Sequence, residues 1–235
     1  MRMIAIFLCA APLAACSAEA QDGGSSTSRE FDVGAFSSVA LSGSHNVVVQ
    51  VGPAASVRAE GPEDQIERLE IGVSGSDLRI GTKKGNWNFG SKRKPLTIYV
   101  TTPSLAGAEV AGSGNIRIDK VAGGRFVAET AGSGDIDIAS LRVDDARFAI
   151  SGSGGIRAAG SAGRAKVEIS GSGDADLAGV ETRTATVSVV GSGNVSARAT
   201  DTANVSIMGS GDVTLGGSAK CKVSKMGSGR VRCGA

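Results

Sequence analysis

The sequence predicts an all-β protein that forms a right-handed parallel β-helix, a solenoid with coils of about 18–20 residues. Three observations lead to this fold class. A Gly-Ser-Gly motif recurs along the chain, apolar residues alternate with polar ones on both sides of each motif, and aromatic residues make up only 3% of the chain. Glycine accounts for 35 of 235 residues, about twice its usual share. We therefore expect a core built in thin layers from Val, Ile, Leu and Ala.

The N-terminal segment has the features of a lipoprotein signal peptide. Residues 1–15 contain one arginine and then an apolar run of about ten residues. This run has the size of a signal-peptide core and is too short for the roughly 20 residues that span a bilayer. It ends in Leu13-Ala14-Ala15-Cys16, so we expect cleavage after Ala15 and acylation of Cys16. The alternative is an ordinary secretory signal cut after Ala15 or Ala20, in which Cys16 has no role.

Residues 16–30 are polar and rich in glycine and serine, and we expect them to form a flexible tether. Ser17 stands where an aspartate often marks retention at the inner membrane, so the outer membrane is favoured. The expected location is the cell envelope, with an outer-membrane lipoprotein facing the periplasm or the cell surface and attached through its N-terminal lipid. The net charge of +2 gives no reason to expect nucleic acid as a partner.

Residues 31–235 are expected to form the solenoid, with irregular early coils over 31–105. The apolar pattern around Gly43 matches that of the later motifs, and a shorter variant surrounds Gly75. Two insertions interrupt these coils. One covers residues 52–70, in which residues 63–69 could form a short helix, and the other covers residues 81–95.

Residues 106–235 carry the regular repeats. In most motifs, apolar residues lie four and two positions before the first glycine, and four and six positions after it. Successive strand residues point to opposite faces, and coils stacked ~4.8 Å apart bury the inward one. The first glycine supplies the positive φ of a sharp corner. The motifs begin at Gly112, Gly132, Gly152, Gly171, Gly191, Gly209 and Gly227.

Two polar positions of the repeat are expected to form columns along the stack. The serine of each motif forms the first. The second holds residues that tolerate turn geometry and hydrogen-bond to nearby backbone, at Asn115, Asp135, Gly155, Asp174, Asn194, Asp212 and Arg230.

Cys221 and Cys233 are the cysteines that follow the tether. Each lies six residues from Gly227, at an inward position of the last coil. An exported protein experiences an oxidising compartment, so we expect a disulfide that closes the open end of the stack. The alternative is a pair of buried free thiols.

The chain resembles the bacterial family named putative auto-transporter adhesin, head GIN domain. The resemblance covers roughly residues 31–233. It is carried by Phe36–Val39, Gly43 with the valines that follow it, the acidic 60–70 insertion, Leu78–Ile80, Thr97–Leu105 and the Gly-Ser-Gly-Asn/Asp repeats. It implies a β-helical extracytoplasmic domain that is often lipid-anchored. It does not imply a biochemical activity, and it offers no catalytic residues to carry over to this chain.

The residues themselves also give little reason to expect an enzyme or a cofactor. His45 is the only histidine, which excludes metal sites with several histidine ligands. Ser44 is adjacent to it, but adjacency in the sequence does not place the two side chains in the geometry of a catalytic triad. Asp135 and Asp174 stand two coils apart, ~9.6 Å, too far for one metal ion. The Gly-Ser-Gly motifs lack the Lys-Ser/Thr and the helix of a phosphate-binding loop.

A basic and aromatic segment is the most distinctive feature of the second insertion. We expect it to contact phospholipid headgroups, lipopolysaccharide or an acidic glycan. The alternative is a solvated hairpin whose tryptophan packs against the first coils. The candidate contact residues are Lys83, Lys84, Trp87, Phe89, Lys92, Arg93 and Lys94.

These features favour a non-catalytic lipoprotein of the cell envelope, a binding or structural module with an adhesive role and an envelope glycan or protein as partner. One alternative is a periplasmic protein that serves envelope maintenance or sensing. A less favoured one is a polysaccharide-cleaving enzyme, which would need paired carboxylates. The oligomeric state stays open.

Overall fold

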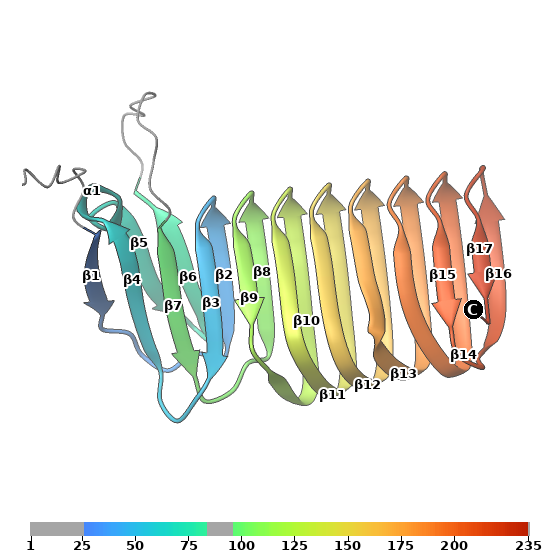
Figure 1. The fold of residues 1–235 in the computed structure, drawn as a ribbon, viewed down its shortest axis with the longest axis horizontal. Helices are drawn as coiled ribbons and strands as arrows, with labels where there is room; N and C mark the ends of the chain where they lie inside the picture. Colours follow the sequence, from blue (N-terminus) through green and yellow to red (C-terminus); the bar gives the residue numbers. More distant parts are fainter. Residues whose placement is uncertain (1–25, 84–95, 235) are drawn as a thin grey trace, which may run out of the picture.

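The structure is a computed structural model that describes residues 26–83 and 96–234, and these form one elongated β-solenoid (Figure 1). Each coil is flattened, with strands on two opposite faces. Sharp turns join the faces along one edge of the stack and wider bends join them along the other. The predicted all-β solenoid is thereby confirmed.

The regular coils pair in parallel at equivalent repeat positions. Ile150 is opposite Ile169, which in turn is opposite Val189. The register shifts lie in or next to the bends, as between Ile138 and Leu141. Coils of unequal length therefore keep both faces in register. The strands are β8 (Gly107–Gly112), β9 (Asn115–Ile118), β10 (Val121–Gly132), β11 (Asp135–Gly152), β12 (Gly155–Gly171), β13 (Asp174–Gly191), β14 (Val195–Gly209), β15 (Val213–Gly216), β16 (Lys220–Met226) and β17 (Val231–Cys233).

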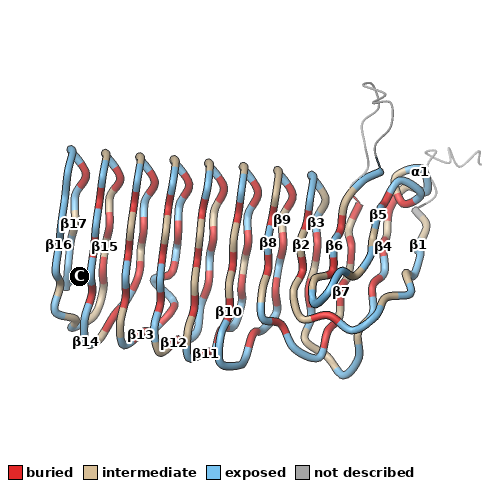
Figure 2. Tube along the Cα trace, turned by 180° about the vertical axis from the view of Figure 1, so that it is seen from behind, coloured by how far each residue is buried: buried red, intermediate tan, exposed pale blue. Residues whose placement is uncertain are grey.

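The core is a single column of aliphatic layers between the two faces. Buried and exposed residues alternate along the strands (Figure 2), as the period of two requires. Phe148 and Ile150 before a turn, and Ile156 and Ala158 after it, are at most 3% exposed. Thr130 occupies an inward position that is aliphatic in most other coils, and its hydroxyl donates to the carbonyl of Gly134 at 2.8 Å. That bond satisfies the one polar group this layer buries.

Both glycines of the motif are required by the stacking of the turns. The first has a positive φ, +128° at Gly132, which side-chain-bearing residues rarely adopt. Its carbonyl accepts two backbone N–H groups of the next coil, from Ser153 at 2.8 Å and Gly154 at 3.0 Å. The second glycine is required by close approach, because a Cβ on Gly154 would collide with the carbonyl oxygen of Gly134.

The early coils are stacked in an order that differs from their order in the sequence. The coil of β2 and β3 pairs on one side with β8 and β9, and on the other side with β6 and β7. Residues 77–102 therefore lie before residues 38–51 in the stack, although they follow them in the chain. The strands are β2 (Ser38–Gly43), β3 (Asn46–Val51), β6 (Asp77–Thr82) and β7 (Thr97–Thr102).

Antiparallel strands cap the N-terminal end of the solenoid. β4 (Ser56–Pro62) pairs with β7 on one side and with β1 (Ser26–Phe31) on the other, while β5 (Leu69–Ser74) pairs with β6. The expected tether is corrected here, because residues 26–30 form most of β1 and hydrogen-bond along β4. The expected helix is present as α1 (Glu63–Ile66) but is shorter than residues 63–69, since Leu69 begins β5.

Candidate functional site

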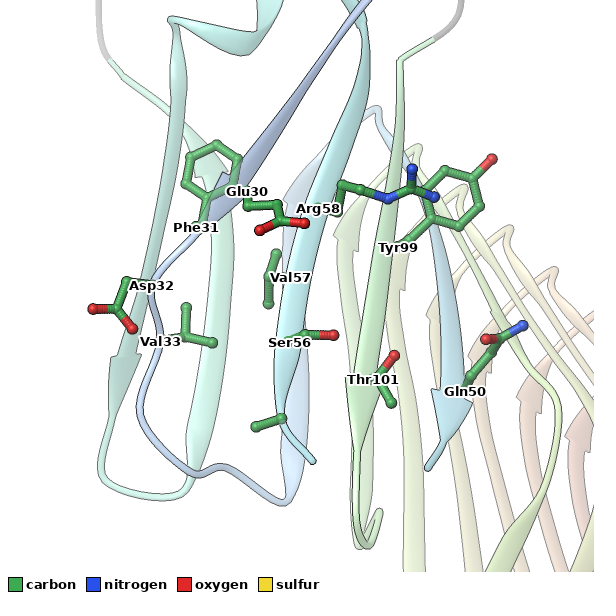
Figure 3. A pocket seen from close by; sticks show the side chains of 11 residues that line it. Glu30, Phe31, Asp32, Val33, Gln50, Ser56, Val57, Arg58, Tyr99 and Thr101 are labelled. Carbon is green, nitrogen blue, oxygen red and sulfur yellow. The ribbon is translucent and has the colours of Figure 1, made fainter. Parts of the chain in front are cut away.

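A groove of 710 Å³ lies on the N-terminal cap, where β1, β4, β7 and β3 run side by side (Figure 3). Its apolar lining residues include Phe31 and Val57. Its polar groups are two carboxylates, an amide, a guanidinium and three hydroxyls, a set that can donate to and accept from a hydroxyl-rich ligand. These groups belong to Glu30, Asp32, Gln50, Ser56, Arg58, Tyr99 and Thr101.

The strand register brings the groove residues together. Arg58 stands opposite Glu30 of β1 and opposite Tyr99 of β7. Because Val57 and Ala59 point into the core and are at most 1% exposed, Arg58 between them points outward. Its guanidinium lies 5.0 Å from the centre of the Tyr99 ring, a cation–π contact, and forms an ion pair with Glu60 at 2.5 Å.

This groove was not predicted from the sequence. Its residues come from three segments far apart in the chain, and β1 and β4 lie in ranges that were expected to be a tether and an insertion. The available signal was the only tyrosine of the chain, Tyr99, at an outward position between the buried residues Ile98 and Val100.

Of the predicted basic and aromatic segment, only Lys83 lies within the described residues. Its backbone N–H donates to the carbonyl of Arg68 at 2.9 Å and its ammonium to the carbonyl of Glu67 at 3.0 Å. At the other end of the insertion, Leu96 is buried. Lys83 is thus held by the N-terminal cap, and Leu96 is part of the hydrophobic core. The other candidates, Lys84, Trp87, Phe89, Lys92, Arg93 and Lys94, lie outside the described residues, as does Cys16.

His45 lies in the turn between β2 and β3. Its Nε2 is 2.9 Å from the hydroxyl of Thr82 in the neighbouring coil, so the ring links two coils near the base of the second insertion. Among residues 26–83 and 96–234, no three His, Cys, Asp or Glu side chains form a group that could hold a metal ion.

The Asn/Asp column forms a ladder that runs from coil to coil. The carboxylate of Asp174 accepts the backbone N–H and the side-chain amide of Asn194, both at 2.9 Å, and Asn194 accepts the N–H of Asp212 at 3.2 Å. Gly155 interrupts the ladder, and there the N–H of Asp174 turns to the carbonyl of Gly154 at 3.3 Å. The predicted backbone bonds of this column therefore reach the next coil.

Ion pairs run across one outer face of the middle coils. Arg147 lies between Glu129, at 2.7 Å, and Glu168, at 2.9 Å. Lys166 contacts Glu168 from the same strand at 2.9 Å. Hydrogen bonds from Lys166 and then from Arg147 lower the pKa of the Glu168 carboxyl below its ordinary value. The positive and negative side chains on this face therefore pair with one another along the stack.

The C-terminal end carries the predicted disulfide between Cys221 and Cys233, whose Cα atoms are 6.5 Å apart, within the usual range for such bonds. In the strand register the two half-cystines cover Ala203 and Leu215 of the preceding coil. The bridge therefore closes one part of the open end. It leaves Val223, at an inward position, 45% exposed because no further coil covers it.

The fold and these surfaces define a parallel β-solenoid with one capped end, a polar groove on the cap and ladder-bearing outer faces. The family model described as "Putative auto-transporter adhesin, head GIN domain" matches residues 35–219. The chain belongs to this family, as the sequence resemblance implied. A comparison with curated proteins gives no match.

Solved structures of bacterial proteins share this fold. A "putative adhesin" from Bacteroides fragilis superposes with a TM-score of 0.84 at 21% identity, covering 89% of this chain and 97% of that chain. A "putative lipid binding protein" from Parabacteroides distasonis gives a TM-score of 0.70 at 24% identity, with the same coverage. At these identities the likeness shows the fold alone. Within the described residues, no helix is long and apolar enough to cross a membrane.

Proposed function

We propose that the chain is a non-catalytic binding module of the bacterial cell envelope, anchored by an acyl chain on Cys16, and that its N-terminal cap binds an envelope glycan. One observation carries this proposal. The strand that directly follows the basic and aromatic segment is β7, which supplies Tyr99 and Thr101 to the groove. The described residues that flank the segment, Lys83 and Leu96, thus belong to the same end of the molecule as the groove.

The chemistry of the cap suits a sugar ligand. Carboxylates, amides and hydroxyls bind sugar hydroxyls through paired donors and acceptors, and aromatic rings supply rigid apolar area. The basic side chains of residues 83–94 add affinity for a glycan that carries acidic groups. The stack behind the cap, held by its ladder and turns, serves as a rigid support.

The test is binding of the purified chain to envelope polysaccharide, measured by calorimetry or by sedimentation with insoluble material. Gln50→Ala with Thr101→Ala, and separately Trp87→Ala with Lys92, Arg93 and Lys94 changed to Ala, should each weaken binding about tenfold or more, since each removes more than one polar or aromatic contact. Ser196→Ala with Thr214→Ala, on the same outer face but in distant coils, is the matched control. Binding that survives both variants would remove the cap as the site.

The location and the alternatives are tested separately. Protease treatment of intact cells, followed by mass spectrometry of the released peptides, distinguishes a surface adhesin from a periplasmic partner that serves envelope maintenance or sensing. Peptides released from unbroken cells support adhesion, whereas protection until the outer membrane is opened supports the periplasmic role. Release of reducing sugar from wall or capsular material would establish the enzyme instead.

A further inference from the structure

The C-terminal end of the solenoid carries an apolar row on its outside. Val190, Met208 and Met226 occupy the position just before the first glycine in three successive coils, and they are 50%, 55% and 69% exposed. The register places Val190 beside Met208 and Met208 beside Met226. In the preceding coils the same position holds serine or alanine, as at Ser151 and Ser170.

Together with Val223, this row contains every large hydrophobic side chain that is exposed in the described part of the chain. All four therefore lie on the last three coils, within about two strand spacings, ~10 Å, of one another along the stack. Scattered exposed apolar residues need no explanation, but a contiguous group at one place marks an interaction surface.

The coil that ends the row is strongly basic. Residues 217–234 contain five basic side chains, all exposed, and no Asp or Glu. Lys225 stands at an inward position that is aliphatic in the two preceding coils, at Val189 and Ile207. Arg230 is the one base of this coil with an ion pair in the described structure, to Asp212 at 2.8 Å. The basic residues are Lys220, Lys222, Lys225, Arg230 and Arg232.

We propose that this end, the C-terminal basic edge formed by Val190, Met208, residues 220–226 and residues 230–232, docks on a bilayer that contains anionic lipids. Exposed apolar side chains flanked by lysines enter the interfacial region while their ammonium groups contact the headgroups. A bilayer is favoured over a second copy of the chain joined end to end, because two positively charged edges would repel each other. It is also favoured over a stable protein partner, because a stable protein interface engages about 20–30 residues on each side, more than this edge contains.

The contact gives the anchored molecule an orientation. Cys16, the proposed acylation site, precedes β1 in the sequence, and β1 lies at the opposite end of the stack (Figure 1). A second contact at the C-terminal basic edge would lay the solenoid along the membrane. The docking itself does not depend on acylation, so it is testable without the lipid.

The test is cosedimentation of the full chain carrying Cys16→Ser, in every arm, with vesicles that contain phosphatidylglycerol or with vesicles of phosphatidylcholine alone. Binding is expected only with phosphatidylglycerol, and it should weaken as salt is raised. Each basic residue near an anionic surface contributes roughly a fivefold gain in binding. Lys222→Glu with Lys225→Glu should therefore lower binding at least about tenfold. Met208→Ser with Met226→Ser should lower it several-fold, because less apolar surface enters the bilayer.

Arg142→Glu with Arg183→Glu makes the same charge change on exposed bends of the middle coils and should leave binding unaltered. The proposal is overturned if the chain binds equally well to vesicles of phosphatidylcholine alone. It is also overturned if this control variant loses as much binding to phosphatidylglycerol vesicles as Lys222→Glu with Lys225→Glu. It is also overturned if a soluble polyanion such as polyglutamate competes fully while the methionine variant binds normally, since the edge then recognises charge without a bilayer. Sedimentation velocity that shows a dimer dispersed by Met208→Ser would assign the row to a second copy instead.

Discussion

Asp212 holds Arg230, the residue at the same repeat position of the next coil, through both its backbone and its side chain. One carboxylate oxygen accepts the backbone N–H of Arg230 at 2.9 Å, and the other accepts the guanidinium at 2.8 and 3.2 Å. This pair ends the ladder that begins where the side-chain amide of Asn115 donates to Asn46. The ladder thus joins early and late coils through one repeated contact, interrupted at Gly155.

Filling that interruption should stabilise the stack. In Gly155→Asn, the new side-chain oxygen is expected to accept the backbone N–H of Asp174, as Asn194 does for Asp212. The gain should be about 0.5–1 kcal/mol in the free energy of unfolding, the net value of one such bond. Urea denaturation measures it. Gly155→Ala adds the Cβ without the amide, and an equal gain in that variant would show that the ladder bond is not the cause.

Adding a methyl group at the second glycine of a motif should be costly. The Cβ of Gly134→Ala would collide with the backbone carbonyl oxygen of Gly114, which cannot give way as the end of a flexible side chain could. We expect a loss of about 2–4 kcal/mol, since overpacking and a lost turn contact add. Gly124→Ala is the control, because its Cβ meets only Asp144 at 3.8 Å. A shift in the urea midpoint no larger than that of the control would contradict the stacking argument.

The ion pairs around Glu168 should make the free energy of unfolding depend on pH. Because Lys166 and Arg147 lower the pKa of the folded carboxyl, its contribution is present above the unfolded pKa of about 4.3 and is lost as pH falls through the folded value. The side chain is 35% exposed, so solvent screening limits the contribution to at most about 1 kcal/mol. Glu168→Gln should lower the urea midpoint at pH 7, and this difference should shrink as pH falls below about 4.3. A difference that stays the same at every pH down to the acid unfolding of the chain would mean that packing causes it.

Reducing the disulfide should loosen only the C-terminal end. The bridge closes a segment with a sequence separation of 12, and removing a bridge of this size costs roughly 2–3 kcal/mol. Each coil contacts mainly its neighbours, so the effect should stay local. Hydrogen exchange with and without reductant should show faster exchange in β16 and β17 and unaltered exchange in β11 and β12. Faster exchange throughout would mean that the end coil controls the whole stack.

The repeat was predictable because its signals are local. An inward residue such as Ile150 is recognised from its distance to the next glycine, and the same distance predicts burial in every Gly-Ser-Gly coil before the last. The disulfide followed from the same count, since Cys221 and Cys233 lie at inward positions on either side of one turn.

The stacking order of the early coils was not predictable in this way. The strands that begin at Ser38 and at Asp77 carry the same pattern, so either could have been the neighbour of β8. The groove depends on this choice, because Tyr99 meets Arg58 only when β7 lies between β3 and β4.

By itself, the sequence determined that this chain is a solenoid, which residues face its core and where its turns lie, because spacing along the chain decides these properties. Only the tertiary structure decided the order of the early coils, the antiparallel cap with its groove, and the outward row that ends at Met226. These depend on which of several equivalent strands pair and on where the stack stops, and the free energy of that choice lies in contacts between segments far apart in the chain.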